Sequence, residues 1–361
     1  MFERKRSAAF RSGLRLLLVS LTAVLIVGGC KKESEPTTPQ IQPLDGWVKQ
    51  ASGTVNYLYN IHFIDANTGT VVGDDGTILR TTDGGATWTP QVGGPNAEFG
   101  SIFTGVAFTD ANHGIVTGHG ATRMLRTTNG GADWFFQKHG LGLMTELYSV
   151  TFPTATTGFA VGGFSQVERG TILGTTNGGA DWSRFTSDEF PWMEFTGVSF
   201  PTADVGYVVG AWGFIIRTDN GGSTWTRQQS GTEMYIQDID FIDANTGFMV
   251  ACEYIPDEDS IRSIDTSRSV ILGTTDGGVV WKNMLMLDGV LLRAVSFADA
   301  NNATVVGSKG TILRTTNRGA TWLTQNSGTT ESLFDVFFTD RNTGTAVGQN
   351  GVILRTTSGG F

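Results

Sequence analysis

Seven copies of one short phrase carry the residue types that could bind a cation or transfer a proton. The phrase reads T-x-D/N-x-G-x-x-W, and its acidic position is occupied by Asp83, Asn129, Asn177, Asn220, Asp276, Asn317 and Ser358. Carboxylates repeated in this way could ligate a metal or act as general acids, but amides and a hydroxyl cannot replace them. We therefore predict that these side chains accept backbone N–H bonds in a turn and that they form no metal or catalytic site.

Other catalytic arrangements are not indicated. The four histidines (His62, His113, His119 and His139) have no metal-ligand spacing, and no nucleophile elbow, phosphate loop or nucleotide fingerprint occurs. A glycosidase needs two carboxyl groups or a Tyr–Glu pair in one pocket. Glu146, Asp188 and Glu194 are conceivable acids, but nothing in the sequence singles them out. We predict no enzyme and no cofactor, with a glycan-binding or glycoside-hydrolysing protein as the alternative.

An arginine stands directly before five of the seven phrases. These residues are Arg80, Arg126, Arg217, Arg314 and Arg355, whereas Gly174 and Gly273 replace it in the other two copies. Two interpretations remain open. The arginines either form ion pairs between neighbouring repeats or stack on the Trp of the phrase, or they form a basic cluster that binds an acidic or carboxylate-bearing partner.

The segments that position these residues are short strands. Residues 58–92 read as four strands with tight turns at DANTG, DDG and DGGA, and this unit recurs along the chain. Units of this length with several strands cannot bury their own faces and must stack in an array. We predict an all-β fold, a seven-bladed β-propeller of four-stranded antiparallel blades lettered a to d from the first strand of each repeat.

The copy number also predicts how the ring closes. The last repeat ends at Phe361, before its fourth strand, while DGWVKQASGT at 45–54 matches the fourth strands of other repeats. We expect this N-terminal segment to complete blade seven, which removes an open sheet edge.

Variation in length is confined to two kinds of connection. The b–c connection grows by five residues in blade three and by fifteen in blade five, and the d–a connection grows before blades two, three and four. In an antiparallel meander these connections share one edge, so we predict one binding face. The segment at 188–195 would place Phe190, Trp192 and Met193 there, unless the loops fold inward and bury them.

The first 30 residues do not belong to the propeller. A basic start precedes an apolar stretch from Leu16 to Val27, which is typical of an export signal. The following VGGC resembles the lipobox of bacterial lipoproteins, and this resemblance implies cleavage and lipidation at Cys30. The alternatives are an ordinary signal peptide or an uncleaved anchor. We predict a signal peptide at 1–29, a lipidated cysteine and tether at 30–44, and the propeller at 45–361.

The charge excludes some partners. Removing five basic residues and Glu3 with the signal leaves 20 basic and 33 acidic side chains, a net charge of −13. A general nucleic-acid surface is not expected at that charge. Cys252 is the other cysteine and has no partner for a disulfide, so we interpret it as a small buried side chain.

The repeated phrase resembles the Asp-box, or bacterial neuraminidase repeat. The longer pattern G-x-x-G-x-I-x-x-T-x-D/N-G-G-x-T-W is similar to that of the photosystem II assembly and stability factor propellers, over residues 45–361. The resemblance implies a non-enzymatic, monomeric scaffold that binds a membrane-protein precursor or complex and uses an arginine patch. Photosynthesis itself does not follow from it, and a glycan remains an alternative ligand. With the lipobox, we expect a lipoprotein of the bacterial cell envelope, anchored at the outer membrane, the periplasmic side or the cell surface.

Overall fold

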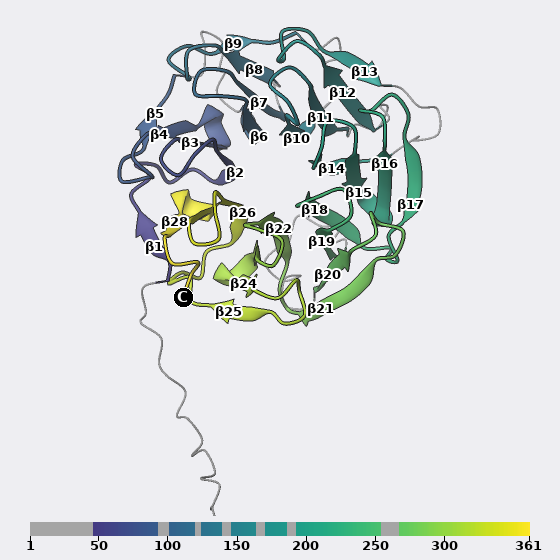
Figure 1. The fold of residues 1–361 in the computed structure, drawn as a ribbon. Coiled ribbons are helices and arrows are strands. Elements are labelled where there is room, and N and C mark those ends of the chain that lie inside the picture. The colour runs from purple at the N-terminus through teal and green to yellow at the C-terminus, as the bar shows by residue number, and fades with distance from the viewer. Residues whose placement is uncertain are drawn as a thin grey trace, which may run out of the picture. The chain divides into compact units, whose positions relative to one another are not determined.

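The structure is a computed structural model and describes residues 46–92, 101–119, 124–138, 146–163, 170–185, 193–253 and 267–361. Within these residues, 28 strands form seven four-stranded antiparallel sheets. The sheets stand around a central axis as the blades of a propeller (Figure 1). The predicted seven-bladed all-β propeller is confirmed.

Each blade runs from an inner strand a, beside the axis, to an outer strand d. The first three blades consist of β2 (Leu58–Phe63), β3 (Gly69–Gly73), β4 (Ile78–Thr81) and β5 (Thr89–Pro90); β6 (Ile102–Phe108), β7 (Gly114–His119), β8 (Met124–Thr127) and β9 (Phe135–Phe136); and β10 (Leu147–Thr151), β11 (Gly158–Gly162), β12 (Thr171–Thr175) and β13 (Ser183–Phe185). Blades four to six consist of β14 (Phe195–Ser199), β15 (Gly206–Gly210), β16 (Phe214–Thr218) and β17 (Thr226–Gln229); β18 (Tyr235–Phe241), β19 (Gly247–Cys252), β20 (Arg268–Thr274) and β21 (Lys282–Asp288); and β22 (Leu292–Phe297), β23 (Ala303–Gly307), β24 (Ile312–Thr315) and β25 (Leu323–Gln325).

Blade seven joins the two ends of the chain, as predicted. It contains β26 (Leu333–Phe338), β27 (Gly344–Gly348), β28 (Ile353–Thr356) and, as its outer strand, β1 (Val48–Gln50). The Nε1 atom of Trp47 donates to Oε1 of Gln325 in blade six at 2.9 Å. Because β1 pairs with β28, the ring closes without an unpaired edge at its C-terminal strand.

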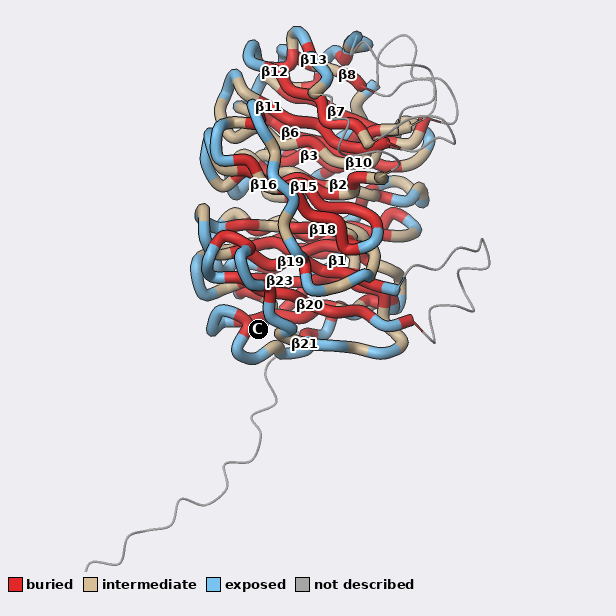
Figure 2. Tube along the Cα trace, turned by 90° about the vertical axis from the view of Figure 1, so that its right-hand side faces the viewer, coloured by how far each residue is buried: buried red, intermediate tan, exposed pale blue. Residues whose placement is uncertain are grey.

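The hydrophobic core lies between the blades. One cluster, for example, joins Val347 and Ile353 of blade seven to Leu58, Ile61 and Phe63 of blade one. The second and third strands of the blades are mostly buried, whereas the outer strands and the turns at both edges are exposed (Figure 2). A blade has apolar residues on both faces, so each sheet is covered only when its neighbours are in place.

The repeated phrase forms the turn between strands c and d. In blade one, Thr81 Oγ1 donates to Oδ1 of Asp83 at 2.8 Å, and the same oxygen accepts the N–H of Thr87 at 2.9 Å. Hydrogen bonds from Thr87 lower the pKa of Asp83 to about 2. Asn129 accepts the N–H of Asp133 in the same way at 2.9 Å, so an amide serves this turn as well as a carboxylate.

The two edges of the ring differ. We call the edge with the a–b and c–d turns the turn face, and the edge with the b–c and d–a connections the insertion face. The long connections at 93–100, 139–145, 164–169, 186–192 and 254–266 lie outside the described residues, and the strand ends that flank them are at the insertion face. Every inner strand begins at this face.

Candidate binding site at the channel mouth

A β-bulge interrupts every inner strand close to its start. In blade one, Leu58 pairs with Gly73 and Asn60 pairs with Val72, so Tyr59 is an extra residue between them. The same shift occurs in the inner strands of the other six blades. Because a bulge re-aims side chains, two consecutive residues of each inner strand face the axis.

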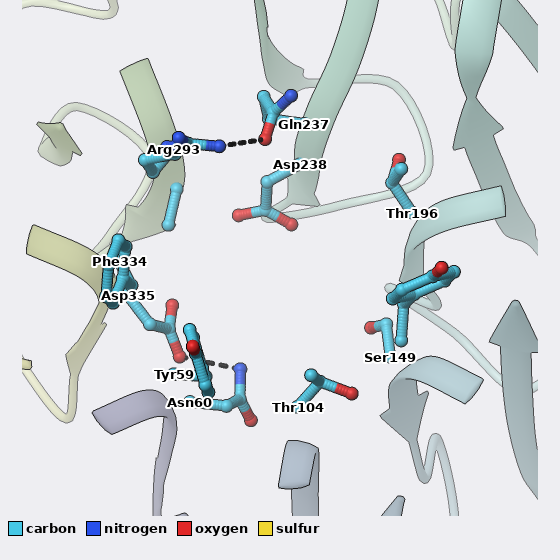
Figure 3. Close-up of a pocket in the computed structure, with 12 residues that line it drawn as sticks. Tyr59, Asn60, Thr104, Ser149, Thr196, Gln237, Asp238, Arg293, Phe334 and Asp335 are labelled. Atoms are coloured by element: carbon cyan, nitrogen blue, oxygen red, sulfur yellow. Dashed lines mark hydrogen bonds between the residues drawn. The ribbon is translucent and has the colours of Figure 1, made fainter. Parts of the chain in front are cut away.

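These bulge residues line a pocket of about 300 Å³ at the insertion-face end of the axis (Figure 3). It is built from all seven blades, and its lining consists of Tyr59, Asn60, Thr104, Tyr148, Ser149, Thr196, Gln237, Asp238, Arg293, Ala294, Phe334 and Asp335. We call this pocket the channel mouth.

One side of the channel mouth is aromatic. The rings of Tyr59 and Phe334 stack with centres 5.2 Å apart and an angle of 29° between their planes. Tyr57, whose residue surface is 37% exposed, approaches Phe334 at 6.0 Å. Stacked rings with an exposed neighbour offer a π face to a ligand at the rim.

Two carboxylates point into the channel mouth (Figure 3). Asp335 Oδ2 accepts hydrogen bonds from Asn60 Nδ2 at 2.7 Å and from the N–H of Ile61 at 2.9 Å. Asp238 Oδ2 accepts the N–H of Val295 at 2.9 Å. Each carboxylate therefore links its inner strand to the inner strand of the next blade.

The next level of the channel repeats this arrangement two residues further along the strands. There, Asp240 Oδ2 accepts the N–H of Phe297 at 2.8 Å. His62 occupies the equivalent position in blade one, and its Nδ1 atom is buried with no hydrogen-bond partner among the described residues. Burial lowers the pKa of His62 to about 4, so its ring is neutral at pH 7.

Burial also shifts the pKa values of the three aspartates. It raises the pKa of Asp238 to about 6 and that of Asp240 to about 7. The pKa of Asp335 is raised well above its usual value by burial and then by the charge of Asp238. Arg293, the basic residue of the pocket lining, donates instead to Gln237 Oε1 at 3.1 Å. Among the ion pairs of the described residues, none includes these three aspartates.

Beside the channel mouth, the structure brings together two acids that the sequence did not single out. Tyr148 Oη donates to Glu146 Oε2 at 2.6 Å, and Tyr148 also hydrogen-bonds to Glu194 of the next blade. Burial raises the pKa of Glu194 and of the Tyr148 hydroxyl. Because its pKa is raised, the Tyr148 hydroxyl is neutral at pH 7 and acts as a hydrogen-bond donor. Asp188, the third candidate, lies outside the described residues.

The strand-c arginines lie at the seams between blades, close to the turn face. Arg80 Nη2 donates to the carbonyl of Ala111, in the a–b turn of blade two, at 2.8 Å, and its guanidinium lies 4.6 Å from the ring centre of Phe108. Arg355 makes the same contacts with Ala66 and Phe63 across the closed ring. Arg80 and Arg355 therefore stack on the strand-a Phe of the next blade, and not on the Trp of the phrase as predicted.

Met193 is the one further predicted binding residue that falls within the described part of the chain. Met193 is half-buried and packs against the apolar cluster between blades three and four. Cys30, Phe190 and Trp192 lie outside the described residues. Arg80 and Arg355 approach the turn face, whereas Met193 lies two residues before the inner strand that begins at Phe195, at the insertion face.

Sequence reasoning missed the channel mouth and one residue at its side. Trp212, at the tip of the b–c turn of blade four, is 61% exposed and has φ 58°. Such a backbone conformation is an outlier for a bulky residue. A usable signal was the pair Asp238 and Asp240, since acids alternating within an otherwise apolar strand indicate a polar channel.

Metal-binding clusters and membrane-spanning helices are both absent from the described residues. No group of three or more His, Cys, Asp or Glu side chains could hold a metal ion there. In the same residues, no helix has the length and apolar character needed to span a membrane.

Comparison with known proteins gives one family and several similar folds. The family described as "Photosynthesis system II assembly factor YCF48" matches residues 41–138 and 135–233. A structure titled "YCF48 bound to D1 peptide" is similar with a TM-score of 0.67 and 19% identity, over 87% of this chain and 97% of that one. YCF48 from Cyanidioschyzon merolae gives a TM-score of 0.65 and 22% identity, over 86% and 98% of the two chains.

A glycoside hydrolase shares the architecture. The GH74 xyloglucanase from Xanthomonas campestris has a TM-score of 0.66 and 14% identity, over 87% of this chain but only 53% of the enzyme. No curated protein matches the sequence. At these identities the structural similarities show the fold alone, whereas the family match covers more than half of the chain.

Proposed function

Since the chain belongs to the family of the photosynthesis system II assembly factor YCF48, we propose that it is a non-enzymatic scaffold that binds a protein partner at its insertion face. The observation that carries this proposal is the family match itself. It gains support from the similar structure of YCF48 bound to D1 peptide. By analogy, the partner here is a membrane-protein precursor or complex, and the scaffold assists its assembly.

The insertion face is our choice for the docking surface. The strand ends that flank the long connections lie there, and the channel mouth opens there with its stacked Tyr59 and Phe334. Rigid scaffolds with variable loops at one edge usually bind through those loops. An aromatic rim around a polar centre suits a peptide that presents both apolar and polar side chains.

Membrane tethering is the second part of the proposal. Acylation at Cys30 would hold the propeller at a bacterial membrane through the tether at 30–44. A tethered propeller meets membrane-protein partners at a high effective concentration, so weak docking would suffice.

The chemistry of the channel mouth favours binding over catalysis. Asp238 and Asp335 each accept backbone N–H bonds that join inner strands, and Tyr148 has a raised pKa. Carboxylates that are engaged in such structural hydrogen bonds are less available to exchange protons with a substrate.

The test is crosslinking in the native membrane. A photo-crosslinking amino acid at Trp212 should give one identified protein adduct by mass spectrometry. The same amino acid at Asn67, in an a–b turn of the turn face, should give none. Replacing Phe190 and Trp192 by Ala should weaken the adduct without lowering the melting temperature Tm. An adduct formed only from position 67 would move the docking surface to the turn face.

A glycan is the second candidate ligand, favoured by the fold shared with a xyloglucanase and by the pairing of aromatic rings with carboxylates in one pocket. A glycan array and an assay of xyloglucan hydrolysis separate the two functions. Binding to an array or release of oligosaccharide, together with the absence of a protein adduct, would replace the scaffold proposal.

A further inference from the structure

The channel mouth holds carboxyl groups that form no ion pair with any described residue. Asp238 and Asp335 point into it, and Asp240 lies at the level below. The carboxylates are close enough to act on one another, because the charges of Asp238 and Asp240 each raise the pKa of Asp335. Buried carboxylates are normally paired with a cation. Arg293 does not supply it, since its Nη1 is hydrogen-bonded to the neutral amide of Gln237.

A second observation comes from His62, at the lower level of the channel. Its Nδ1 atom is buried and has no hydrogen-bond partner among the described residues. A neutral imidazole has one nitrogen that accepts a hydrogen bond, and burial keeps this ring neutral at pH 7. The channel therefore contains carboxyl groups and, at its lower level, a buried nitrogen that accepts no hydrogen bond from a described residue.

The aromatic rim fits the same kind of ligand. The stacked rings of Tyr59 and Phe334 lie on the same side of the channel mouth as Asp335 (Figure 3), and cations bind well to ring faces. The distance also fits, because a lysine side chain extends roughly 6 Å and two residues of a strand span about 6.6 Å. A basic side chain that enters at the rim would place its charge at the level of Asp238 and Asp335, with Asp240 at the next level of the channel.

We propose that the channel mouth receives a lysine or arginine side chain of the bound partner, with its stem against Tyr59 and Phe334 and its charge between Asp238 and Asp335. This inference rests on the proposed binding function and specifies what the partner presents. Filling a 300 Å³ pocket with one anchor side chain would fix the position of an extended segment on the insertion face.

The experiment measures binding of fluorescein-labelled Gly-Ser-Lys-Ser-Gly, with matched peptides carrying norleucine or glutamate in place of lysine. Wild-type protein should bind the lysine peptide, with at least about tenfold weaker binding of the others, as expected for charge-assisted hydrogen bonds. The double variant Asp238→Asn/Asp335→Asn should lose this preference. An Asn oxygen can still accept the N–H groups of Val295 and Ile61, which protects the fold.

The matched control is Asp243→Asn/Asp340→Asn. These carboxylates come from the same two blades, also accept backbone N–H bonds, and lie in a–b turns of the turn face. The change in net charge is identical, so wild-type affinity here and lost affinity in the channel variant would support the inference. Equal loss in both variants would show non-specific attraction and overturn it.

The variant Arg293→Gln should change the affinity for the lysine peptide in the opposite direction. Removing a like charge from the pocket lining should tighten binding of the lysine peptide, whereas a pocket for an anionic ligand would then bind the glutamate peptide less well. If the channel variant does not fold, wild-type protein still decides the matter. Its affinity for the lysine peptide should rise between pH 5 and pH 8 with release of protons, and a pH-independent affinity would contradict the inference.

Failure of the basic anchor and failure of the proposed scaffold function give different results. If crosslinking to the partner persists in Asp238→Asn/Asp335→Asn at wild-type yield, the scaffold function stands and the basic anchor is excluded. If no partner adduct forms in wild-type protein but the lysine peptide binds in the channel, the pocket stands and the scaffold function fails.

Discussion

The guanidinium carbon of Arg314 lies 4.5 Å from the ring centre of Phe338 in the next blade. Its Nη1 donates to Thr304 Oγ1 at 2.7 Å, and Nη2 donates to the carbonyl of Arg341. Thr304 stands opposite Arg314 in the strand pair of blade six. One buried side chain thus joins two strands of its own blade to an inner strand and a turn of the following blade.

The blades without this arginine show what replaces it. In blade five, Phe248 stands opposite Gly273 and stacks on Phe297 of blade six at 4.8 Å. A Cβ atom at Gly273 would lie 2.8 Å from the Phe248 ring, so the ring needs a glycine beside it. Blade three repeats this pair with Phe159 and Gly174. A Thr–Arg pair and a Phe–Gly pair are therefore two solutions for one seam.

Replacing the Thr–Arg pair of blade six by a Phe–Gly pair should preserve the fold. Arg314→Gly alone removes a buried stack and its hydrogen bonds, and we expect a loss of about 3 kcal/mol in the free energy of unfolding. Thr304→Phe/Arg314→Gly recreates the pair of blade five and should recover at least half of that loss. Chemical denaturation of the three proteins measures both effects, and a double variant no more stable than Arg314→Gly would refute the equivalence.

The arginines also distinguish seam packing from partner docking. Arg217 is more exposed than Arg314, and Tyr207 stacks on Phe241 in its place at 3.7 Å. Arg314→Ala should therefore lower the Tm clearly, Arg217→Ala should lower it little, and neither should reduce crosslinking to the partner. Reduced crosslinking at unchanged Tm would instead support the basic cluster considered in the sequence analysis.

The sequence predicted the repeated blades, but it did not predict which residues of each inner strand face the central axis. Seven copies of the Trp phrase gave the blades, and the match of 45–54 to other outer strands predicted that β1 lies beside β28. The channel mouth was missed because the bulge at Tyr59 interrupts the alternation of side chains along the inner strand. Strict alternation would place one of the two consecutive residues that face the axis in the core instead. The sequence also does not reveal this pocket because its lining residues come from seven segments that are far apart in the chain.

Deleting the closing strand should cost far more stability than deleting the tether. Removal of 45–54 eliminates β1 with Trp47 and its bond to Gln325, which exposes the edge of β28. We expect the Tm of this truncation to fall by more than 10 °C, on the order of several kcal/mol, and removal of 31–43 to change it little. Equal melting temperatures would argue against a structural role for the shared blade.

Lipidation is tested at Cys30. The variant Cys30→Ala should abolish incorporation of a labelled fatty acid and shift the protein from the membrane fraction to the aqueous one, because no acyl chain remains. Cys252→Ala is the control, since that buried thiol should not be acylated. Undiminished labelling of Cys30→Ala would rule out the lipobox interpretation.

The channel aspartates predict how stability depends on pH. A carboxyl group whose folded pKa is raised binds its proton more tightly in the folded state, so stability is highest below the unfolded pKa and falls as pH rises through the folded one. For Asp238 and Asp240 this window runs from about pH 4 to about pH 7. Asp240→Asn should therefore raise the Tm at pH 8, by an equivalent of about 2 kcal/mol, and leave it nearly unchanged at pH 4. An equal change of Tm at both pH values would contradict a charged, buried Asp240.

Trp212 combines a strained backbone with exposure at the insertion face. Asp75, Lys309 and Asn350 occupy the same left-handed position in other b–c turns, and a bulky residue is the least suited to it. Trp212→Asn should relieve the strain, so we expect the free energy of unfolding to stay the same or rise by up to about 1 kcal/mol. Crosslinking of the partner from a second site on the insertion face should nevertheless fall at least tenfold, as for an aromatic anchor. Lys309→Asn, at the matching turn of blade six, should change neither quantity. A variant that loses stability and keeps full crosslinking would mean that Trp212 serves the fold and not the partner.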